Sequence, residues 1–340
     1  MRSLIAAIAV CLAGCSADPE PVSVGPRLEA RLVATWPVAA PAREATFSRD
    51  GRLLATSDAS GLITLCDTRS WKPLEQLHHP GGATTVVFSG DGSHLYSAGY
   101  DGAVRDWDVA RKTVSRTFSG ASGTIWTMDV SPDGKTLAVG GEDSLIRLWA
   151  LERDSPATVL RGHARNIWRV RFSPNGKTLA SGSFDASARL WDASTGRPLH
   201  ILKGHTEAIV GLDFSPDGKL LVTGGDDSTI RYWRASDGAP VRTIDAGKHV
   251  DAVTFTPDGK WIASGGHARG AIGTLWHQAT GGGADGDSVR LWRTADGALT
   301  AVLRHPDDVI SLTVSPDGNW LVTSGEDNRF RLWRLRPGTS

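Results

Sequence analysis

The chain has 340 residues, and its 37 Lys plus Arg balance 37 Asp plus Glu, for a formal net charge of +0 at pH 7. This balance gives no strong electrostatic case for nucleic acid or an anionic surface as a ligand. The cysteines are Cys11, Cys15 and Cys66. Only Cys66 keeps a free thiol if the chain is processed and lipidated at Cys15, which excludes an internal disulfide.

The first residues are expected to be removed rather than folded. Met1-Arg2-Ser3 is a short positive start, and Leu4 to Leu12 is an apolar run too short to span a bilayer as a helix. The run ends in Leu12-Ala13-Gly14-Cys15, which resembles a bacterial lipobox. The resemblance implies a signal peptide over residues 1–14, cleavage before Cys15, and lipidation of its thiol and new amino group. The alternatives are an ordinary secretory peptide or a stray apolar terminus.

A lipidated Cys15 would anchor the chain in the bacterial cell envelope, stably if it carries two or three acyl chains. Ser16 rather than Asp follows the cysteine. By similarity to lipoproteins of two-membrane bacteria, this favours the outer membrane, with the chain facing the periplasm. Residues 15–27 are the expected tether, since they contain three prolines and no apolar run. At roughly 3 Å per residue, the tether would hold the domain about 30 Å from the lipid.

Residues 28–336 are organised as a repeat. A turn residue before glycine recurs every 41 or 42 residues, with 59 residues between the last two, at Asp50, Asp91, Asp133, Asn175, Asp217, Asp258 and Asp317. A second marker follows 16 residues after each turn, at Cys66, Trp107, Trp149, Trp191, Trp233, Trp292 and Trp333. In the sixth unit this distance is 34, which indicates an insertion of 18 residues. A period near 40 with four β-type runs is typical of a propeller blade.

These units resemble the WD-repeat β-propeller family. The resemblance rests on Gly162-His163, Gly204-His205, Ser215-Pro216-Asp217-Gly218, Trp107-Asp108 and Trp191-Asp192. It implies an all-β fold, a seven-bladed β-propeller of four-stranded antiparallel blades. Radial stacking around a channel would bury both faces of sheets too small to be stable alone. The Asp-Gly turns supply the positive φ that a tight hairpin needs.

One strand stands apart from the repeat. Arg31–Trp36 reads as a lone strand before the first turn, and the last unit stops at its third strand, Phe330–Trp333. We therefore expect the N-terminal strand to complete the seventh blade and close the ring of a monomeric propeller, because closure removes exposed edges. An open ring and an eight-bladed ring are the alternatives.

Four blades carry a polar set that the resemblance assigns to one hydrogen-bonded network per blade. The sets are His79, Ser97, Asp101 and Trp107; His163, Ser181, Asp185 and Trp191; His205, Thr223, Asp227 and Trp233; and His305, Thr323, Asp327 and Trp333. We interpret them as structural rather than catalytic, because they recur with the fold period and buried polar groups need partners. The first and third blades lack parts of the set. Cys66, at a tryptophan position, is expected to be a small buried filler.

The insertion, at about residues 267–286, falls between the second and third strands of the sixth blade. The resemblance places this loop on the face called the top, with the repeat histidines. It combines Leu275-Trp276 with three consecutive glycines, and we interpret it as a partner-contacting loop. A disordered spacer is one alternative. The other is a metal site using His267, His277, Asp285 or Asp287, although the spacing matches no compact ligand motif and no metal or cofactor is predicted.

Two tryptophans outside the repeat positions are the second candidate contact. Trp126 and Trp168 each stand seven residues before their turn, in adjacent blades. They are expected at the top rim of the channel, where Arg165 and Arg169 add hot-spot composition. The alternative is that they pack between blades.

These observations predict a non-catalytic platform for protein–protein interaction, with one or more envelope proteins as partners. One alternative is a hydrolase or lyase at the channel mouth, using His249, Asp251, His267 or His277. Another is a small-ligand sensor using Trp126 and Trp168. An enzyme should show polar channel residues that break the repeat, and few are expected.

Overall fold

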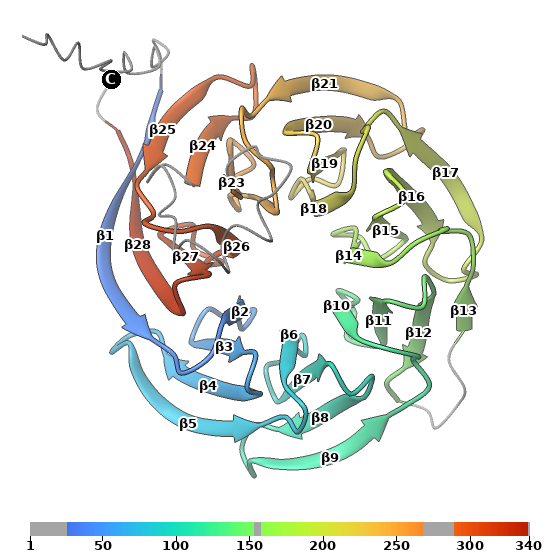
Figure 1. Ribbon diagram of the computed structural model, residues 1–340, viewed down its shortest axis with the longest axis vertical. Coiled ribbons are helices and arrows are strands. Elements are labelled where there is room, and N and C mark those ends of the chain that lie inside the picture. The colour runs from blue at the N-terminus through green and yellow to red at the C-terminus, as the bar shows by residue number, and fades with distance from the viewer. Residues whose placement is uncertain (1–25, 153–157, 268–288, 339–340) are drawn as a thin grey trace, which may run out of the picture.

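The protein is a seven-bladed β-propeller. The computed structural model describes residues 26–152, 158–267 and 289–338. In these ranges every regular element is a strand, and the strands form seven four-stranded antiparallel sheets around a central axis (Figure 1). The predicted fold class and blade number are confirmed.

Six blades consist of four consecutive strands, ordered from the centre to the rim. Blade 1 holds β2 (Ala42–Phe47), β3 (Leu53–Asp58), β4 (Leu62–Asp67) and β5 (Lys72–His78); blade 2 holds β6 (Ala83–Phe88), β7 (His94–Gly99), β8 (Val104–Asp108) and β9 (Thr113–Phe118). Blade 3 holds β10 (Ile125–Val130), β11 (Thr136–Gly141), β12 (Ile146–Ala150) and β13 (Thr158–Leu160); blade 4 holds β14 (Ile167–Phe172), β15 (Thr178–Ser183), β16 (Ser187–Asp192) and β17 (Pro198–Lys203). Blade 5 holds β18 (Ile209–Phe214), β19 (Leu220–Gly225), β20 (Thr229–Arg234) and β21 (Pro240–Asp245); blade 6 holds β22 (Ala252–Phe255), β23 (Trp261–Gly265), β24 (Val289–Arg293) and β25 (Leu299–Leu303).

Blade 7 joins the two ends of the chain. Its sheet contains β26 (Val309–Val314), β27 (Trp320–Gly325), β28 (Arg329–Pro337) and, at the rim, β1 (Leu28–Pro37). The ladder between β1 and β28 runs from Leu28 opposite Pro337 to Pro37 opposite Arg329 (Figure 1). The predicted closure by the N-terminal strand is confirmed, and the open and eight-bladed arrangements are excluded.

A turn of fixed geometry joins the first and second strands of each blade. Ser48 Oγ donates a hydrogen bond to Asp50 Oδ1 (2.7 Å), and the same Oγ accepts one from Leu53 N–H (2.9 Å). The following glycine has a φ between 69° and 73° in all seven blades, a conformation that glycine adopts without strain. We call the face that carries these turns the bottom. The loops between second and third strands, and those between blades, lie on the opposite face, the top.

Blades 4 and 5 contain the expected polar network. In blade 4, Trp191 Nε1–H donates to Ser181 Oγ (2.9 Å), His163 Nε2 lies 2.7 Å from the same oxygen, and His163 Nδ1 lies 2.9 Å from Asp185. The four side chains of blade 5 make the same contacts at 2.8 to 3.0 Å. Each network satisfies a buried indole, imidazole and hydroxyl together.

Blades 2 and 7 depart from this pattern. The His79 ring is turned over, so that Nδ1 meets Ser97 (2.8 Å) and Nε2 meets Asp101 (3.1 Å). In blade 7, the four residues of the expected set do not form one hydrogen-bonded network. Trp333 still donates to Thr323 (3.1 Å), but His305 bonds the carbonyl of Asp307 and Nη1 of Arg331, which also pairs with Asp327. Burial and the neighbouring guanidinium lower the pKa of His305 to about 4, so this imidazole is neutral.

Seven apolar clusters fill the spaces between blades, and the seam between blades 7 and 1 differs from the others. Six clusters each contain one repeat tryptophan, whereas the seam contains Cys66, which is buried as predicted. Three further tryptophans pack at the seam instead, Trp36 against Phe330 (6.4 Å between ring centroids) and Trp71 against Trp320 (5.0 Å). The volume missing at Cys66 is therefore supplied from other positions.

The network predicts a difference between two similar substitutions. Trp191→Phe should lower the free energy of unfolding by about 1 kcal/mol more than Trp149→Phe, because Trp191 loses a buried hydrogen bond whereas blade 3 has Val139 at the acceptor position. Both variants lose similar packing. Urea denaturation of the two proteins measures the difference, and equal losses would show that the indole hydrogen bond contributes nothing.

Candidate functional site

An aromatic arc lies on the top face of blades 2 to 4. The rings of Trp126 and Trp168 stack at 4.7 Å between centroids, with an interplanar angle of 27°. Tyr100 meets Trp126 edge-on (6.0 Å), and Phe184 meets Trp168 in the same way (5.3 Å). All four rings are half-buried. We call these four residues the aromatic patch.

The patch combines the two interpretations of the tryptophans, a contact surface at the top rim and packing between blades. Trp126 and Trp168 pack on one another across the boundary between blades 3 and 4, yet each keeps an exposed part. Sequence reasoning missed Tyr100 and Phe184. Both stand nine residues after the turn residue of their blade, a position that is acidic in blades 3, 5 and 7. An aromatic residue in place of the acid was therefore a sequence signal that could have identified them.

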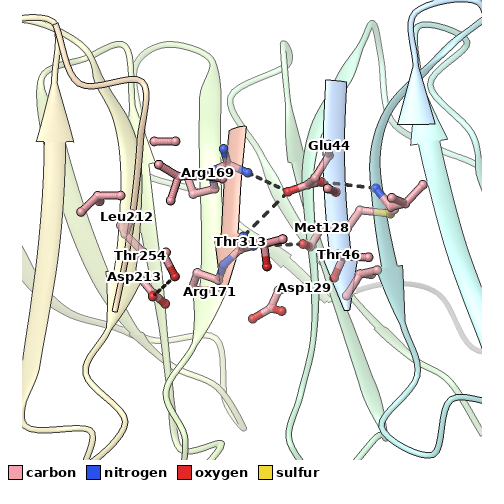
Figure 2. A pocket seen from close by; sticks show the side chains of 16 residues that line it. Glu44, Thr46, Met128, Asp129, Arg169, Arg171, Leu212, Asp213, Thr254 and Thr313 are labelled. Carbon is pink, nitrogen blue, oxygen red and sulfur yellow. Dashed lines mark hydrogen bonds and ion pairs between the residues drawn. The ribbon is translucent and has the colours of Figure 1, made fainter. Parts of the chain in front are cut away.

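Arg169 does not lie on the surface beside these tryptophans. Its side chain points into the channel, where Nη1 donates to Glu44 Oε1 at 2.9 Å (Figure 2). Only 9% of the residue is exposed. Arg169 is therefore engaged within the propeller, in contrast to the role expected for it.

A second cluster lies on the top face where blade 6 continues into the insertion. His267 Nδ1 lies 2.7 Å from Asp251 Oδ2, and the rings of His249 and His267 are 4.4 Å apart. His249 Nδ1 lies 3.8 Å from Asp226 Oδ1. Three of the residues named for a channel-mouth enzyme are thus brought together, and we call Asp226, His249, Asp251 and His267 the imidazole–carboxylate cluster.

The cluster has shifted proton affinities. Burial would lower the pKa of His267, but its hydrogen bond to Asp251 and the charges of Asp251, Asp308 and Asp226 raise that pKa to about 9. Burial, together with the charge of Asp251, raises the pKa of Asp226 to about 6. At neutral pH, His267 is therefore a cation held by carboxylates and can donate a proton but not accept one.

The remaining insertion residues lie outside the described part of the chain. These include Leu275, Trp276 and His277, together with Asp285 and Asp287. Cys15 also lies outside the described ranges. The expected roles of Leu275 and Trp276 in partner contact and of Cys15 in lipidation stay predictions, and the metal site stays an untested alternative.

The channel is lined by one equivalent residue from each blade, four positions before the turn. These residues are Thr46, Val87, Asp129, Arg171, Asp213, Thr254 and Thr313, around a cavity of about 200 Å³ (Figure 2). With Glu44 and Arg169, the lining contains three carboxylates and two guanidinium groups. The expectation of few polar channel residues was wrong, since these charges interrupt a position that is apolar or Thr in four blades.

The channel carboxylates join one blade to the next. Asp129 accepts a hydrogen bond from Phe172 N–H (2.6 Å), which links blades 3 and 4. Asp213 accepts from Phe255 N–H (2.9 Å), which links blades 5 and 6, and Glu44 accepts from Val86 N–H (3.3 Å), which links blades 1 and 2. These backbone donors lie at the inner edges of the sheets and need a partner. The charges therefore have a structural role that requires no substrate.

Burial raises the pKa of Asp129 to about 6 and also raises that of Asp213. Within the lining, Asp213 also accepts a hydrogen bond from the Thr254 hydroxyl (2.9 Å). In the described ranges, no group of three or more His, Cys, Asp or Glu is arranged to hold a metal ion. Of the residues that the structure describes, none belongs to a helix long and apolar enough to cross a bilayer.

The described strands form a closed seven-bladed propeller whose top face carries the aromatic patch and the imidazole–carboxylate cluster. A family model described as "WD domain, G-beta repeat" matches residues 71–108, 112–150, 154–192, 196–234, 238–271 and 297–334, together more than half of the chain. The chain belongs to the WD-repeat family. The segment 112–150 contains β9 to β12, so one sequence repeat joins the outer strand of one blade to three strands of the next.

Individual relatives match only short stretches. A coronin-like protein of Saccharomyces cerevisiae is 37% identical over 75 residues, 21% of this chain and 12% of the relative. Protein HIR1 of Candida albicans is 35% identical over 89 residues, 25% of this chain and 9% of the relative. WD repeat-containing protein 1 of Mus musculus is 33% identical over 94 residues, 24% of this chain and 16% of the relative. The matches thus span a small part of each relative.

The raised pKa of Asp129 predicts pH-dependent stability. Because its native pKa of about 6 lies above the usual value of 3.8, the native state binds the proton more tightly, and stability falls as pH rises from about 4 to 6. Asp129→Asn should flatten this fall while still accepting from Phe172 N–H. Urea midpoints between pH 4 and 7 test this, with exposed Glu152→Gln as control. An unchanged pH profile in the Asn variant would contradict the prediction.

His267 offers a direct titration. Its imidazole should remain protonated to about pH 9 in the native protein, and Asp251→Asn should lower this pKa, because the ion pair opposes the effect of burial. NMR titration of the ring protons measures both values. Exposed Lys203→Gln, at the end of β17, is the control for a general change of charge. A wild-type pKa near 6.5 would refute the ion pair.

Proposed function

We propose that this protein is a non-catalytic platform for protein–protein interaction at a bacterial envelope membrane. Lipidated Cys15 anchors the chain, and partners bind the top face, including the sixth-blade insertion. Families built on closed propellers supply rigid surfaces, and the function of each member depends on the residues displayed there. The partners are one or more proteins of the envelope.

The aromatic patch carries this proposal. Four rings from three consecutive blades are in contact, and each is held by its neighbours while keeping an exposed part. Arg43 Nη2 donates to the Tyr100 hydroxyl (2.7 Å), which fixes one end of the arc. Tryptophan and tyrosine held rigidly in this way lose little conformational entropy on binding and are enriched at interaction hot spots.

The direction of β1 is compatible with a lipid anchor on the bottom face, opposite the aromatic patch. Leu28, the first residue of β1, pairs with Pro337 at the bottom end of blade 7. A tether over residues 15–27 therefore joins the propeller at the bottom face. The top face then points away from the lipid, toward partners.

The imidazole–carboxylate cluster favours a second candidate, a hydrolase or lyase at the channel mouth. A protonated His267 beside Asp251 could supply a general acid. A small-ligand sensor would instead use the stacked faces of Trp126 and Trp168.

Partner capture distinguishes the platform from these alternatives. The full chain is crosslinked in bacterial cells as wild type, as Trp126→Ala/Trp168→Ala, and with residues 268–286 deleted. The double substitution should reduce recovery of a specific envelope protein by about tenfold or more, because hot-spot truncations are costly. Ile201→Ala/Val241→Ala removes exposed apolar groups from outer strands and should leave recovery unchanged.

Two further measurements keep the test interpretable. Trp126→Phe/Trp168→Phe preserves the stacked rings, so partial retention of the partner would separate loss of contact from loss of fold. Thermal unfolding of each variant is compared with wild type. An unchanged partner list in all variants would refute the platform, and loss of a hydrolytic activity in His267→Gln alone would favour the enzyme.

A further inference from the structure

A groove with basic and apolar walls lies at the bottom of blade 7, outside the sites described above. It has a cavity volume of about 570 Å³ and is lined by Glu29, Ala30, Arg31, Leu32, Val33, Trp320, Arg334 and Arg336. We call it the blade 7 groove. The lining residues come from both ends of the chain, because β1 supplies five of them and β27 and β28 supply the other three. These strands are neighbours in the sheet of blade 7 (Figure 1).

The register of the sheet places the charges on one face. Arg31 is directly opposite Arg334, and Arg334 is directly opposite Trp320. Residues paired in this way project from the same side of a sheet, and so do residues two positions apart, which adds Arg336. The Arg334 guanidinium carbon lies 4.5 Å from the centroid of the Trp320 ring, which holds the group in place.

The groove has an excess of positive charge. Its three arginines face one lining carboxylate, Glu29, and the charge of Asp317 also acts on Arg334. In the described part of the chain, none of the three guanidinium groups forms an ion pair, although Glu29 is directly opposite Arg336. Like charges directly opposite on a sheet are destabilising, as for Arg31 and Arg334. An anion between the two guanidinium groups would remove this repulsion.

The groove also has an apolar edge. The register of β1 shifts between Leu32 and Ala34, and such a bulge changes the direction of local side chains. Leu32 is 44% exposed and Val33 is 52% exposed. Arginines, exposed aliphatic side chains and a tryptophan are together the composition of a surface that binds at the boundary between headgroups and acyl chains.

The chain itself leads to this place. The groove occupies β1 from Glu29 to Val33, one residue after the strand begins at Leu28. Any chain from Cys15 to this strand is short, spanning at most about 45 Å when fully extended. A lipid attached at Cys15 would therefore keep the groove near the bilayer and raise its effective concentration there.

We propose that the blade 7 groove binds the phosphate headgroups of anionic phospholipids, with Arg31, Arg334 and Arg336 as ligands and Leu32 and Val33 at the acyl boundary. This turns the blade 7 side of the bottom face to the membrane. The aromatic patch, on blades 2 to 4, lies on the far side of the ring and on the other face. The orientation rests on the proposed anchor at Cys15, whereas the lipid contact does not.

Vesicle flotation tests the contact without the anchor. Full-length Cys15→Ser is mixed with vesicles of phosphatidylcholine alone, or of phosphatidylcholine with a minority of phosphatidylglycerol. The apolar run at residues 4–12 can insert into both, so the preference for anionic vesicles is the quantity compared. Arg31→Glu/Arg336→Glu should reduce this preference by about tenfold.

The matched control is Arg161→Glu/Lys203→Glu, which makes the same change in net charge at exposed positions on the top side of blade 4. It should leave the preference unchanged. Two results would overturn the proposal: a wild type with no preference for anionic vesicles, and equal losses of that preference in both charge-reversed variants. The first result would favour an acidic protein segment as the ligand of the groove. Arg31→Gln/Arg336→Gln, a milder change, should give an intermediate loss and guards against misfolding.

The anchor is read out separately, by incorporation of labelled fatty acid into the wild-type chain in cells. Labelling without an anionic preference refutes the groove and keeps the anchor. An anionic preference without labelling refutes the anchor and keeps the groove.

Discussion

The antiparallel pairing of β1 with β28 is the interaction on which the rest of the structure depends. A four-stranded blade is apolar on both faces and is stable only between two neighbours, so the last blade must meet the first. Here the ends of the chain supply strands of one sheet, from Leu28 opposite Pro337 to Pro37 opposite Arg329. Loss of this ladder would expose β28 and both sides of the seam together.

The seam also shows how the repeat tolerates an irregular member. Cys66 fills less space than the tryptophan found at the same position in the other six units. Trp36, Trp71 and Trp320 supply rings at the same interface from three other places in the chain. An interface between blades must be closely packed, but the side chains that fill it need not come from the repeat position. A unit that lacks the repeat tryptophan can therefore still form a blade of the closed ring.

Charged side chains have different roles in the channel and on the top face of the propeller. In the channel, Glu44, Asp129 and Asp213 satisfy backbone donors of the next blade, so their presence needs no ligand. On the top face, acids gather with two histidines at the base of the insertion. The aromatic patch and the blade 7 groove, which our proposals assign to partners and lipid, lie on opposite faces of one rigid ring.

The sequence by itself determined the architecture, because a residue's place in a repeat fixes its strand, its distance from the axis and the end of the sheet at which it lies. It therefore predicted seven blades, closure by the N-terminal strand, and Trp126 and Trp168 at the top rim. Only the tertiary structure decided which residues of different blades meet. Arg169 reaches Glu44 across 125 residues of sequence, and Arg31 lies opposite Arg334. Such contacts depend on the radius and closure of the ring, which no single repeat encodes.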